Sequence, residues 1–323
     1  MAVTTYIQAI NQALAEEMAR DPLTFVMGED VVLSAFGATK GLIDKFGPTR
    51  VRNTPIAEAG FVGAAVGAAM AGTRPICEVE FASFFYCAFD QVCNQAAKLR
   101  YMSGGQARMP ITFRCVYGAM GGAAAQHSET VYAQFLSVAG LKLVVPSNPS
   151  DMKGLLKSAI RDDNPVLYFE HKLLYATKGE VPDDPDFLVP LGKAAIARPG
   201  DALTLVAISA MVPKALKAAE RLAKDGHQVE VIDPRSLNPF DRTTIIESVK
   251  KTGKIVVAEE SYKTLGVGAE IGAMLMEDAL EYIDRPLRRV AIPDVPIPTT
   301  AGLEQFVIPS EEKIYQACRE LLA

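Results

Sequence analysis

The sequence lacks several features that define whole classes of protein. Its five cysteines, in 323 residues, form no Cys-x-x-Cys pair, which indicates reduced thiols in a cytoplasmic compartment and not a disulfide scaffold. Its three histidines have no metal-ligand spacing, which argues against a zinc enzyme. The first residues lack the basic and apolar regions of a signal peptide, and the small-apolar run 59–72 is shorter than the roughly 20 residues of a membrane helix. We therefore expect neither secretion nor a membrane anchor.

Strong charge of either sign is also missing. Lysine and arginine number 33 against 38 aspartates and glutamates, a formal net charge of −5, and no basic run is present. A nucleic-acid-binding protein would show a basic patch, so we expect no nucleic-acid partner. Hydrophobic residues make up 49% and charged residues 22%, which is typical of a folded globular chain long enough for two domains.

Three common site motifs are absent. The chain has no Gly-x-x-x-x-Gly-Lys-Ser/Thr, no Gly-x-Gly-x-x-Gly after a predicted strand, and no Gly-x-Ser-x-Gly. Gly266-Val-Gly268 opens a predicted helix, but two glycines there could serve packing alone. The sequence therefore offers no cradle for a phosphate group.

Short apolar runs alternate with helical patterns along the whole chain. Such alternation predicts an α/β fold, with mostly parallel sheets covered by helices. The expected strands of the first half are 24–27, 76–79, 111–114, 141–145 and 166–169, separated by helices near 4–20, 56–71, 84–102, 128–138 and 150–161. The expected strands of the second half are 203–208, 229–232, 254–258 and 288–292, with helices near 212–225, 241–251, 267–283 and 311–322. A proline- and acid-rich linker, 179–195, divides a domain at 1–178 from one at 196–323.

Glu58 is the first candidate for chemistry. It lies close to the start of a predicted helix in which Gly60, Gly63 and Gly67 alternate with alanines, although glycine costs about 1 kcal/mol per helical position relative to alanine. Such a helix gains close backbone approach to another element or subunit. The helix dipole favours the carboxylate, whereas desolvation favours the acid, so this carboxyl could share a proton with a bound heterocycle. A surface glutamate that caps the helix is the structural alternative.

His127 is the second candidate, because a loop of small residues delivers it just before a predicted helix. Histidine titrates near neutrality and can transfer protons, although a histidine that caps a helix would have the same pattern. We expect His171 and His227 to be structural. The aromatic cluster 81–86 is either core or a wall for a planar ring. The helix end 158–165 leaves carbonyls beside carboxylates, which could hold a monovalent cation or be solvated.

Several ordered motifs resemble one family. They are Met27-Gly-Glu-Asp30, Thr54-Pro-Ile-Ala-Glu-Ala-Gly60, Phe89-Asp-Gln-Val-Cys-Asn-Gln-Ala-Ala97, Arg100-Tyr-Met-Ser-Gly-Gly105, Gln126-His-Ser128 and Lys153-Gly-Leu-Leu156. With a second half similar to the transketolase C-terminal domain, the chain resembles the β subunit of thiamine-diphosphate-dependent 2-oxo acid dehydrogenases. The resemblance covers essentially the whole chain and implies a pyrimidine-binding domain at 1–178 and a transketolase C-terminal-like domain at 196–323.

The resemblance also implies roles for single residues. Glu58 would bond to the aminopyrimidine of thiamine diphosphate and drive its imino tautomer, which takes the thiazolium proton. Phe84 would stack on that ring, with Ile56 and Glu29 also at cofactor-binding positions. His127 would act near the reactive carbon and in acyl transfer to lipoyl-lysine. Backbone oxygens would supply most of a potassium site whose positions are Ile111, Ala159, Ile160, Asp162 and Asn164.

The family divides its cofactor pocket between two polypeptides. The α chain carries the Gly-Asp-Gly motif that binds magnesium and diphosphate, and this motif is absent here. The resemblance therefore implies an oxidoreductase that is active only as an α2β2 heterotetramer and that serves a lipoyl-bearing acyltransferase core. The segment 31–38 and Glu129 depart from the family pattern, which leaves the substrate open. Pyruvate is the first expectation and acetoin the second; a split transketolase-like ketol transferase and a scaffold subunit are the alternatives.

Overall fold

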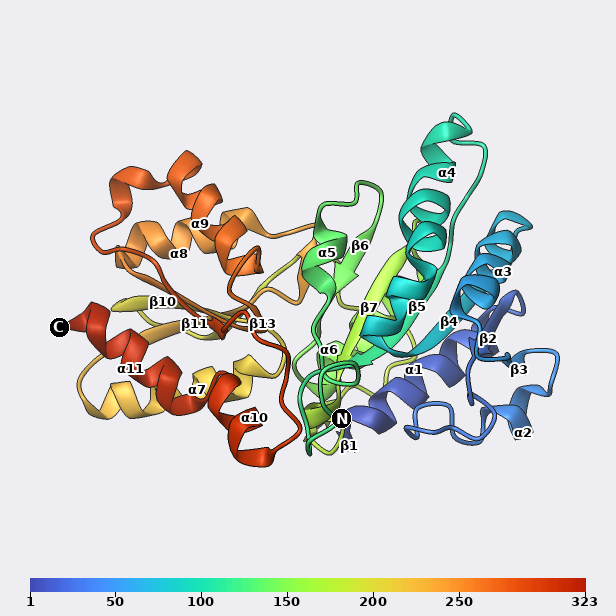
Figure 1. Ribbon diagram of the computed structural model, residues 1–323, viewed down its shortest axis with the longest axis horizontal. Coiled ribbons are helices and arrows are strands. Elements are labelled where there is room, and N and C mark those ends of the chain that lie inside the picture. The colour runs from blue at the N-terminus through green and yellow to red at the C-terminus, as the bar shows by residue number, and fades with distance from the viewer. The chain divides into compact units, whose positions relative to one another are not determined.

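The computed structural model describes all residues, 1–323, and divides into two compact units (Figure 1). The first unit comprises Met1–Tyr117 and Gln134–Leu191, and the second comprises Gly118–Ala133 and Gly192–Ala323. Each unit has a mostly parallel sheet with helices, which confirms the predicted α/β fold class. The segment 118–133 clusters with the second unit although its neighbours in the chain belong to the first.

The sheet of the first unit is parallel throughout. Its strands lie in the order β6–β7–β5–β4–β2–β3. Their bounds are β2 Thr24–Gly28, β3 Val51–Asn53, β4 Arg74–Phe81, β5 Thr112–Tyr117, β6 Lys142–Val144 and β7 Val166–His171. Every residue of β2, β5 and β7 is buried, so both faces of these strands are covered, and the buried residues include the charged side chains Arg114 on β5 and Glu170 on β7.

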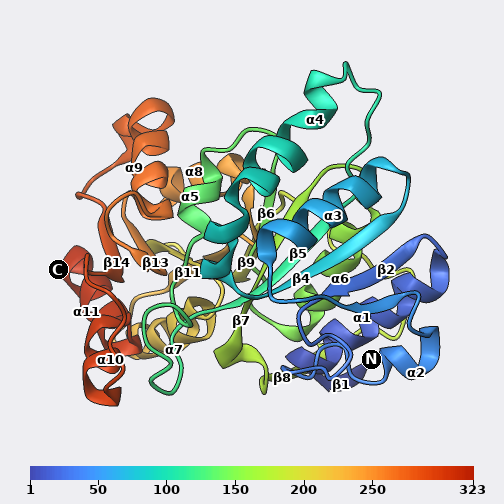
Figure 2. The same cartoon turned by 45° about the vertical axis from the view of Figure 1, so that its right-hand side comes forward.

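Helices cover this sheet. They are α1 Tyr6–Arg20, α2 Leu42–Phe46, α3 Glu58–Met70, α4 Ala97–Met102, α5 Tyr132–Leu136 and α6 Pro149–Arg161. A 3₁₀ turn, Ala82–Ala88, and a π-helix, Gln91–Ala96, precede α4, so the predicted helix at 84–102 has three kinds of turn. Two packed pairs can be followed in Figure 2: α1 lies against α6, and α3 lies against the segment 82–96.

The linker region has structure of its own. The strand β1, Ala2–Thr5, pairs antiparallel with β8, Lys178–Val181, which lies at the start of the predicted linker. A short 3₁₀ turn, Lys172–Leu174, comes just before β8. The predicted domain limits, 178 and 196, stay a prediction, and the division between the compact units after Leu191 falls inside the predicted linker.

The second unit has the strand order β14–β13–β10–β11–β9. Only β9 is antiparallel to its neighbour. The strands are β9 Ala195–Arg198, β10 Leu203–Ala207, β11 Val229–Asp233, β13 Ile255–Tyr262 and β14 Arg288–Ile292, with β12 Ser236–Asn238 outside this sheet. The helices are α7 Met211–Lys224, α8 Arg242–Thr252, α9 Val267–Asp278, α10 Ala301–Val307 and α11 Glu311–Leu322, with a 3₁₀ turn at Leu280–Tyr282.

A buried ion network ties the central strands of the first unit together. Arg114 on β5 donates to Glu170 on β7 through Nε (2.6 Å) and Nη2 (2.9 Å), and to Glu78 on β4 through Nη1 (2.5 Å). The Tyr175 hydroxyl also donates to Glu170, at 2.9 Å. The guanidinium and the Glu170 carboxylate are almost fully buried, so the pairing is needed to offset their desolvation.

No helix in the chain combines the length and the apolar character needed to cross a lipid bilayer.

Candidate active site

Glu58 is the first residue of α3, two residues after the start of the helix predicted near 56–71. The chain leaves β3 at Asn53, and the amide of Thr54 donates to the carbonyl of Gly28, which joins the ends of β3 and β2. No side chain caps the helix, so the free amides of its first turn and the helix dipole act on whatever lies there. Glu58 is half-buried, and Oγ1 of the nearby Thr54 is buried without a hydrogen-bond partner.

Glu29 follows β2 directly and belongs to the same acidic group. Its side chain is only 5% exposed, and its Oε1 atom has no hydrogen-bond partner. Burial, followed by the negative charges of Glu58, Glu80 and Asp30, raises the pKa of Glu29 to about 7. At neutral pH this carboxyl is therefore close to half protonated, beside a second carboxyl at a helix N-terminus. The charge of Glu58 is thus one cause of the proton affinity of Glu29.

Gly28 fixes where these carboxyls stand. A Cβ atom on Gly28 would lie 2.2 Å from the Glu78 carbonyl oxygen, and its φ of +155° is one that other residues rarely adopt. The strand can therefore approach β4 closely only with glycine at this position.

Apolar and aromatic groups belong to the same unit. Phe84 is half-buried and packs edge-on against Phe81, with ring centroids 5.4 Å apart, and Phe81 packs edge-on against Phe36. Ile56, two residues before Glu58, is 85% exposed. An isoleucine in this position can contact a bound group or a second polypeptide. The structure thus places Glu29, Ile56, Glu58 and Phe84 in the first unit.

The glycines of α3 are not explained by packing within the chain. A Cβ at Gly67 would have no neighbour within 4 Å, and one at Gly60 would only reach the side chain of Ala57, at 3.8 Å. Gly63 is the exception, because its Cβ would lie 3.3 Å from the Gln91 side chain. The exposed residues of α3 are apolar and mostly small: Ala59, Gly60, Ala64 and Gly67, with Met70 at the end of the helix. This face can approach another backbone closely.

His127 belongs to the second unit and is exposed. Its loop makes a tight turn in which the amides of Ser128 and Glu129 both donate to the carbonyl of Ala125. Glu129, which departs from the family pattern, bonds to the Tyr262 hydroxyl, and burial raises the pKa of its carboxyl despite that bond. His127 is thus presented on a structured loop and not on a free one.

The structural role expected for the other two histidines stays a prediction, and their surroundings differ. His171 is fully buried; its Nδ1 accepts from the Leu173 amide, and its ring packs edge-on against Tyr117 at 4.8 Å. His227 follows the turn at Gly226, after α7.

The predicted potassium positions lie around the end of α6. In the structure, positively charged side chains bind to the oxygens there. Nη1 of Arg74 donates to the carbonyls of Ile160 (3.2 Å) and Asp162 (3.0 Å). The Asp162 carboxylate pairs with Lys142; burial opposes its ionisation, but the bonds from Lys142 and Asn164 lower its pKa. Arg74 was not predictable as a partner of this helix end, because nothing in the neighbouring sequence links it to residues more than 80 positions away.

The remaining predicted positions also have hydrogen-bond partners, two from the backbone and one from a side chain. The Ile111 carbonyl accepts from the Val166 amide (3.0 Å), and the Ala159 carbonyl accepts from the Asp162 amide (3.2 Å). Oδ1 of Asn164 accepts from Arg100 at 3.1 Å. A carbonyl oxygen has two lone pairs, so each backbone oxygen keeps capacity for a second contact. No group of three or more His, Cys, Asp or Glu side chains is arranged to hold a metal ion.

The glycine pair before α9 does not form a phosphate cradle. Glu259 occupies this helix N-terminus, and its carboxylate accepts from the amides of Val267 (2.9 Å) and Gly268 (2.8 Å). A Cβ at Gly266 would lie 2.6 Å from the Tyr262 carbonyl oxygen. The glycines therefore serve this internal cap, as the packing alternative predicts.

Both parts of the chain match known protein families. The family described as "Transketolase, pyrimidine binding domain" matches residues 3–178, and "Transketolase, C-terminal domain" matches 192–314. The acetoin:2,6-dichlorophenolindophenol oxidoreductase subunit beta of Bacillus subtilis is 44% identical, covering 99% of this chain and 97% of that one. The pyruvate dehydrogenase E1 component subunit beta of Rickettsia felis is 46% identical, covering 98% of both. The chain belongs to this family of β subunits.

Two further relatives mark the breadth of the β-subunit family. The 2-oxoisovalerate dehydrogenase subunit beta of Bacillus subtilis is 45% identical over 99% of both chains. A solved structure titled "Split gene transketolase, inactive beta4 tetramer" has a TM-score of 0.79 and 25% identity, covering 98% of this chain and 97% of that one. The resemblance inferred from the motifs is thereby confirmed. Because relatives with three different names are almost equally similar, identity alone does not select a substrate.

Proposed function

We propose that this chain is the β subunit of a thiamine-diphosphate-dependent component that oxidatively decarboxylates a 2-oxo acid, pyruvate first, or cleaves acetoin, and passes the acyl group to a lipoyl domain. The observation that carries the proposal is the pair of carboxyls formed by Glu29, directly after β2, and Glu58, at the start of α3. It is supported by the full-length similarity to pyruvate dehydrogenase and acetoin oxidoreductase β subunits.

The residues present fit the pyrimidine end of thiamine diphosphate. Oε1 of Glu29 and Oγ1 of Thr54 are buried polar atoms without partners, which is a costly arrangement unless a bound group or water satisfies them. Glu58 would accept from the ring, Phe84 would stack on it, and Ile56 would contact it. When bound, the cofactor supplies a nucleophilic carbon that attacks the substrate carbonyl and then delocalises the charge left by bond cleavage.

The chain's own residues would handle protons around that chemistry. Glu58, at the start of α3, would share a proton with a ring nitrogen of the bound cofactor. Glu29, with a pKa of about 7, would lend or take a proton beside it near neutral pH. His127, on its structured loop, would serve the later stage, in which the acyl group passes to lipoyl-lysine.

The proposal needs a partner. Neither the Gly-Asp-Gly motif nor a phosphate cradle is present in this chain, so an α subunit would hold the diphosphate and magnesium. The small-residue face of α3 fits close packing of helices in an α2β2 heterotetramer. A potassium ion at the end of α6 and a lipoyl-bearing acyltransferase core also belong to this proposal. The five free cysteines fit a cytoplasmic, reducing compartment.

The test is Glu58→Gln in the co-expressed pair of subunits. The variant keeps the side-chain shape but cannot ionise, and we expect turnover with 2-oxo acid and an electron-accepting dye to fall about 100-fold or more. Glu311→Gln is the matched control, because Glu311 is likewise the first residue of its helix, α11. Its turnover should be unchanged. Retained cofactor-dependent turnover in Glu58→Gln, with the α partner bound, would remove Glu58 from this role.

A ketol transferase is the second candidate, favoured by the likeness to the split gene transketolase structure. The two differ in their acceptor, because one passes an acyl group to lipoate and the other a ketol group to a sugar. Turnover with sugar phosphates, and none with a lipoyl domain, would decide for the transferase.

A further inference from the structure

The segment 118–133 lies at the place where open α/β sheets bind ligands. In the second unit the chain passes from β10 to β11 on one side of β10, and then to β13 on the other side. Strand order therefore reverses between β10 and β13, and the crevice at the carboxyl ends of such strands is the usual ligand site of this sheet type. In this chain a piece of its own backbone occupies that region.

Glu260 holds the start of the segment. It lies near the carboxyl end of β13, is 3% exposed, and accepts a hydrogen bond from the Ala119 amide through Oε1 at 2.7 Å. Lys214, in the first turn of α7 next to β10, faces the same carboxylate: burial lowers the pKa of Lys214, and Glu260 opposes that shift. Glu260 therefore stands at the reversal point between the two strands, with its carboxylate bound to the segment.

Glu304 holds the segment a few residues further on. This glutamate lies on α10, is 8% exposed, and accepts from the Gly122 amide through Oε2 at 3.0 Å. Gly122 has a φ of +74°, and a Cβ there would lie 2.4 Å from the Thr299 carbonyl oxygen. A backbone amide can reach Glu304 in this way only when residue 122 is glycine.

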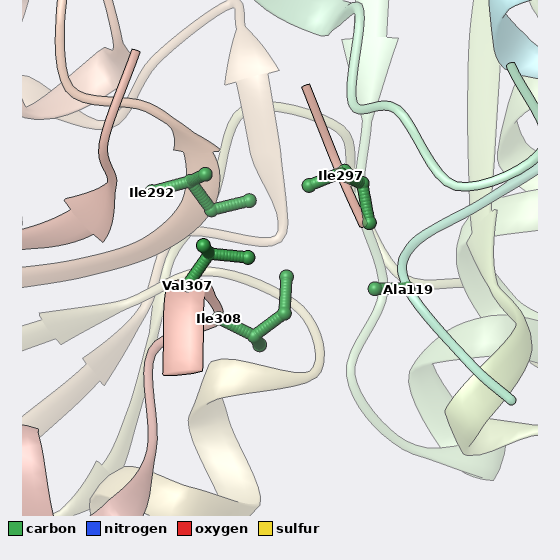
Figure 3. Close-up of a cluster of buried hydrophobic side chains, with 5 residues drawn as sticks. All are labelled: Ala119, Ile292, Ile297, Val307 and Ile308. Atoms are coloured by element: carbon green, nitrogen blue, oxygen red, sulfur yellow. The ribbon is translucent and has the colours of Figure 1, made fainter. Parts of the chain in front are cut away.

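An apolar cluster packs around Ala119, next to the contact of its amide with Glu260 (Figure 3). It consists of Ala119, Ile292, Ile297, Val307 and Ile308, all buried, with Tyr262 packed against it. Figure 3 shows the Ala119 side chain facing the isoleucines contributed by the C-terminal part of the chain. On the other side of His127, the Glu129 carboxyl bonds to the Tyr262 hydroxyl. The loop is thus fixed before and after its histidine.

We propose that the second unit fixes the position of the loop that carries His127. In this proposal Glu260 and Glu304 are positioning residues, because their carboxylates bind the backbone amides of Ala119 and Gly122. The inference rests on the proposed function, in which His127 acts in acyl transfer. A displacement of about 1 Å at such a group can lower a rate on the order of 100-fold. The hydrogen bonds that fix the loop therefore affect turnover, although Glu260 and Glu304 do not themselves contact the substrate.

The test compares Glu304→Ala with Glu304→Gln in the complex with the α subunit. Alanine removes the acceptor, whereas the glutamine amide oxygen can still accept from Gly122. We expect amide hydrogen exchange across 118–133 to rise about tenfold or more in Glu304→Ala and to stay within about threefold of the parent in Glu304→Gln. Glu230→Ala is the matched control, because Glu230 is a buried, ion-paired glutamate of the same unit that does not contact the loop.

Kinetics give the second measurement. In Glu304→Ala we expect kcat for acylation of a lipoyl domain to fall about fivefold or more, with KM for the 2-oxo acid within about twofold and with recovery in Glu304→Gln. Gly122→Ala, which disturbs the same contact from the loop side, should reproduce the exchange result if Glu304→Ala folds poorly. If amide exchange across 118–133 in Glu304→Ala equals that in Glu230→Ala, Glu304 does not fix the loop. If exchange is faster in Glu304→Ala but kcat is unchanged, fixing the loop does not position His127 for the reaction.

His127→Ala separates this inference from the proposed function. If that variant keeps full acyl transfer, the role of His127 is wrong, while the exchange experiment still decides whether Glu304 holds the loop.

Discussion

Replacement of Glu29 by glutamine tests the acidic pair through its effect on stability. The pKa of Glu29 is raised from an ordinary value near 4.5 to about 7, first by burial and then by the charge of Glu58. Glutamine has nearly the same shape and is neutral at every pH, so the wild type and Glu29→Gln differ mainly in the ionisation of one carboxyl.

The sign of the effect follows from proton linkage. Below pH 4.5 the carboxyl is protonated in both the folded and the unfolded chain, and the pKa shift has no effect. Between 4.5 and 7 the unfolded chain has lost the proton that the folded chain keeps, so folded wild type loses stability as pH rises. Above 7 the whole difference is present. A shift of that size corresponds to at most about 3 kcal/mol, at 1.36 kcal/mol per pKa unit.

The assay is urea unfolding of both proteins at intervals between pH 5 and 8. We expect the free energy of unfolding of Glu29→Gln to gain on that of the wild type by about 1–3 kcal/mol across this range, with most of the change below pH 7. In a Glu58→Gln background the step should move to lower pH, because one of the charges that raise the Glu29 pKa is gone. A difference that stays flat from pH 5 to 8 would refute the buried, proton-holding carboxyl.

Three further outcomes are expected. Arg114→Met should lower the free energy of unfolding in urea by about 3–5 kcal/mol, because it leaves buried carboxylates unpaired. Arg288→Met, which breaks an exposed ion pair, should lower it by less than about 1 kcal/mol. A larger loss in Arg288→Met than in Arg114→Met would contradict the burial argument. Gly28→Ala should destabilise by about 2 kcal/mol or more through its clash with the Glu78 carbonyl, whereas Gly302→Ala, with nothing within 4 Å, should be neutral or stabilising in thermal unfolding. Exchange of potassium for a bulky organic cation should lower the melting temperature if the carbonyls at the end of α6 bind the ion, and an unchanged melting temperature would remove potassium from the proposal.

Strands and helices with a strong periodic pattern were predictable from the sequence. The apolar runs in β2 and in the first four residues of β7 indicate burial on both faces, and both strands are buried throughout. Helix starts carry local signals, such as Asn148 before Pro149, where the asparagine side chain caps α6. Glu58 was identifiable for the same reason, because a turn and a helix start are encoded within a few residues.

Short edge strands and long-range partners were not predictable in this way. The strands β3, β8 and β9 have three or four residues each, too few to show a period, and exist because a neighbouring strand pairs with them. The sequence gives no local sign that Arg74 would reach the end of α6 or that Arg114 would bind two glutamates on different strands. These pairings depend on the sheet order, which is a property of the whole unit.

The segment 118–133 shows the same limit at the scale of a domain. Its glycines and alanines predict a flexible loop, and the histidine within it is all that composition reveals. Its true constraints lie 140 to 180 residues away, in the carboxylates of Glu260 and Glu304. A loop of small residues can make these hydrogen bonds because its backbone amides, and not its side chains, donate to the two carboxylates.

Two features of the first unit destabilise it in isolation, and together they argue for a complex. Glycines in α3 cost helix stability, about 1 kcal/mol each relative to alanine, and at Gly60 and Gly67 no packing inside the chain offsets that loss. The oxygen of Glu29 is buried without a hydrogen bond next to a second carboxyl, which is also unfavourable. Gly60 lies near the start of α3, beside the carboxyls, and Gly67 lies two turns further along the helix. A partner backbone against the small-residue face and a polar ring beside the carboxyls would offset both costs, so the isolated chain should be the less stable form and the assembled, cofactor-loaded complex the form for which this helix is built.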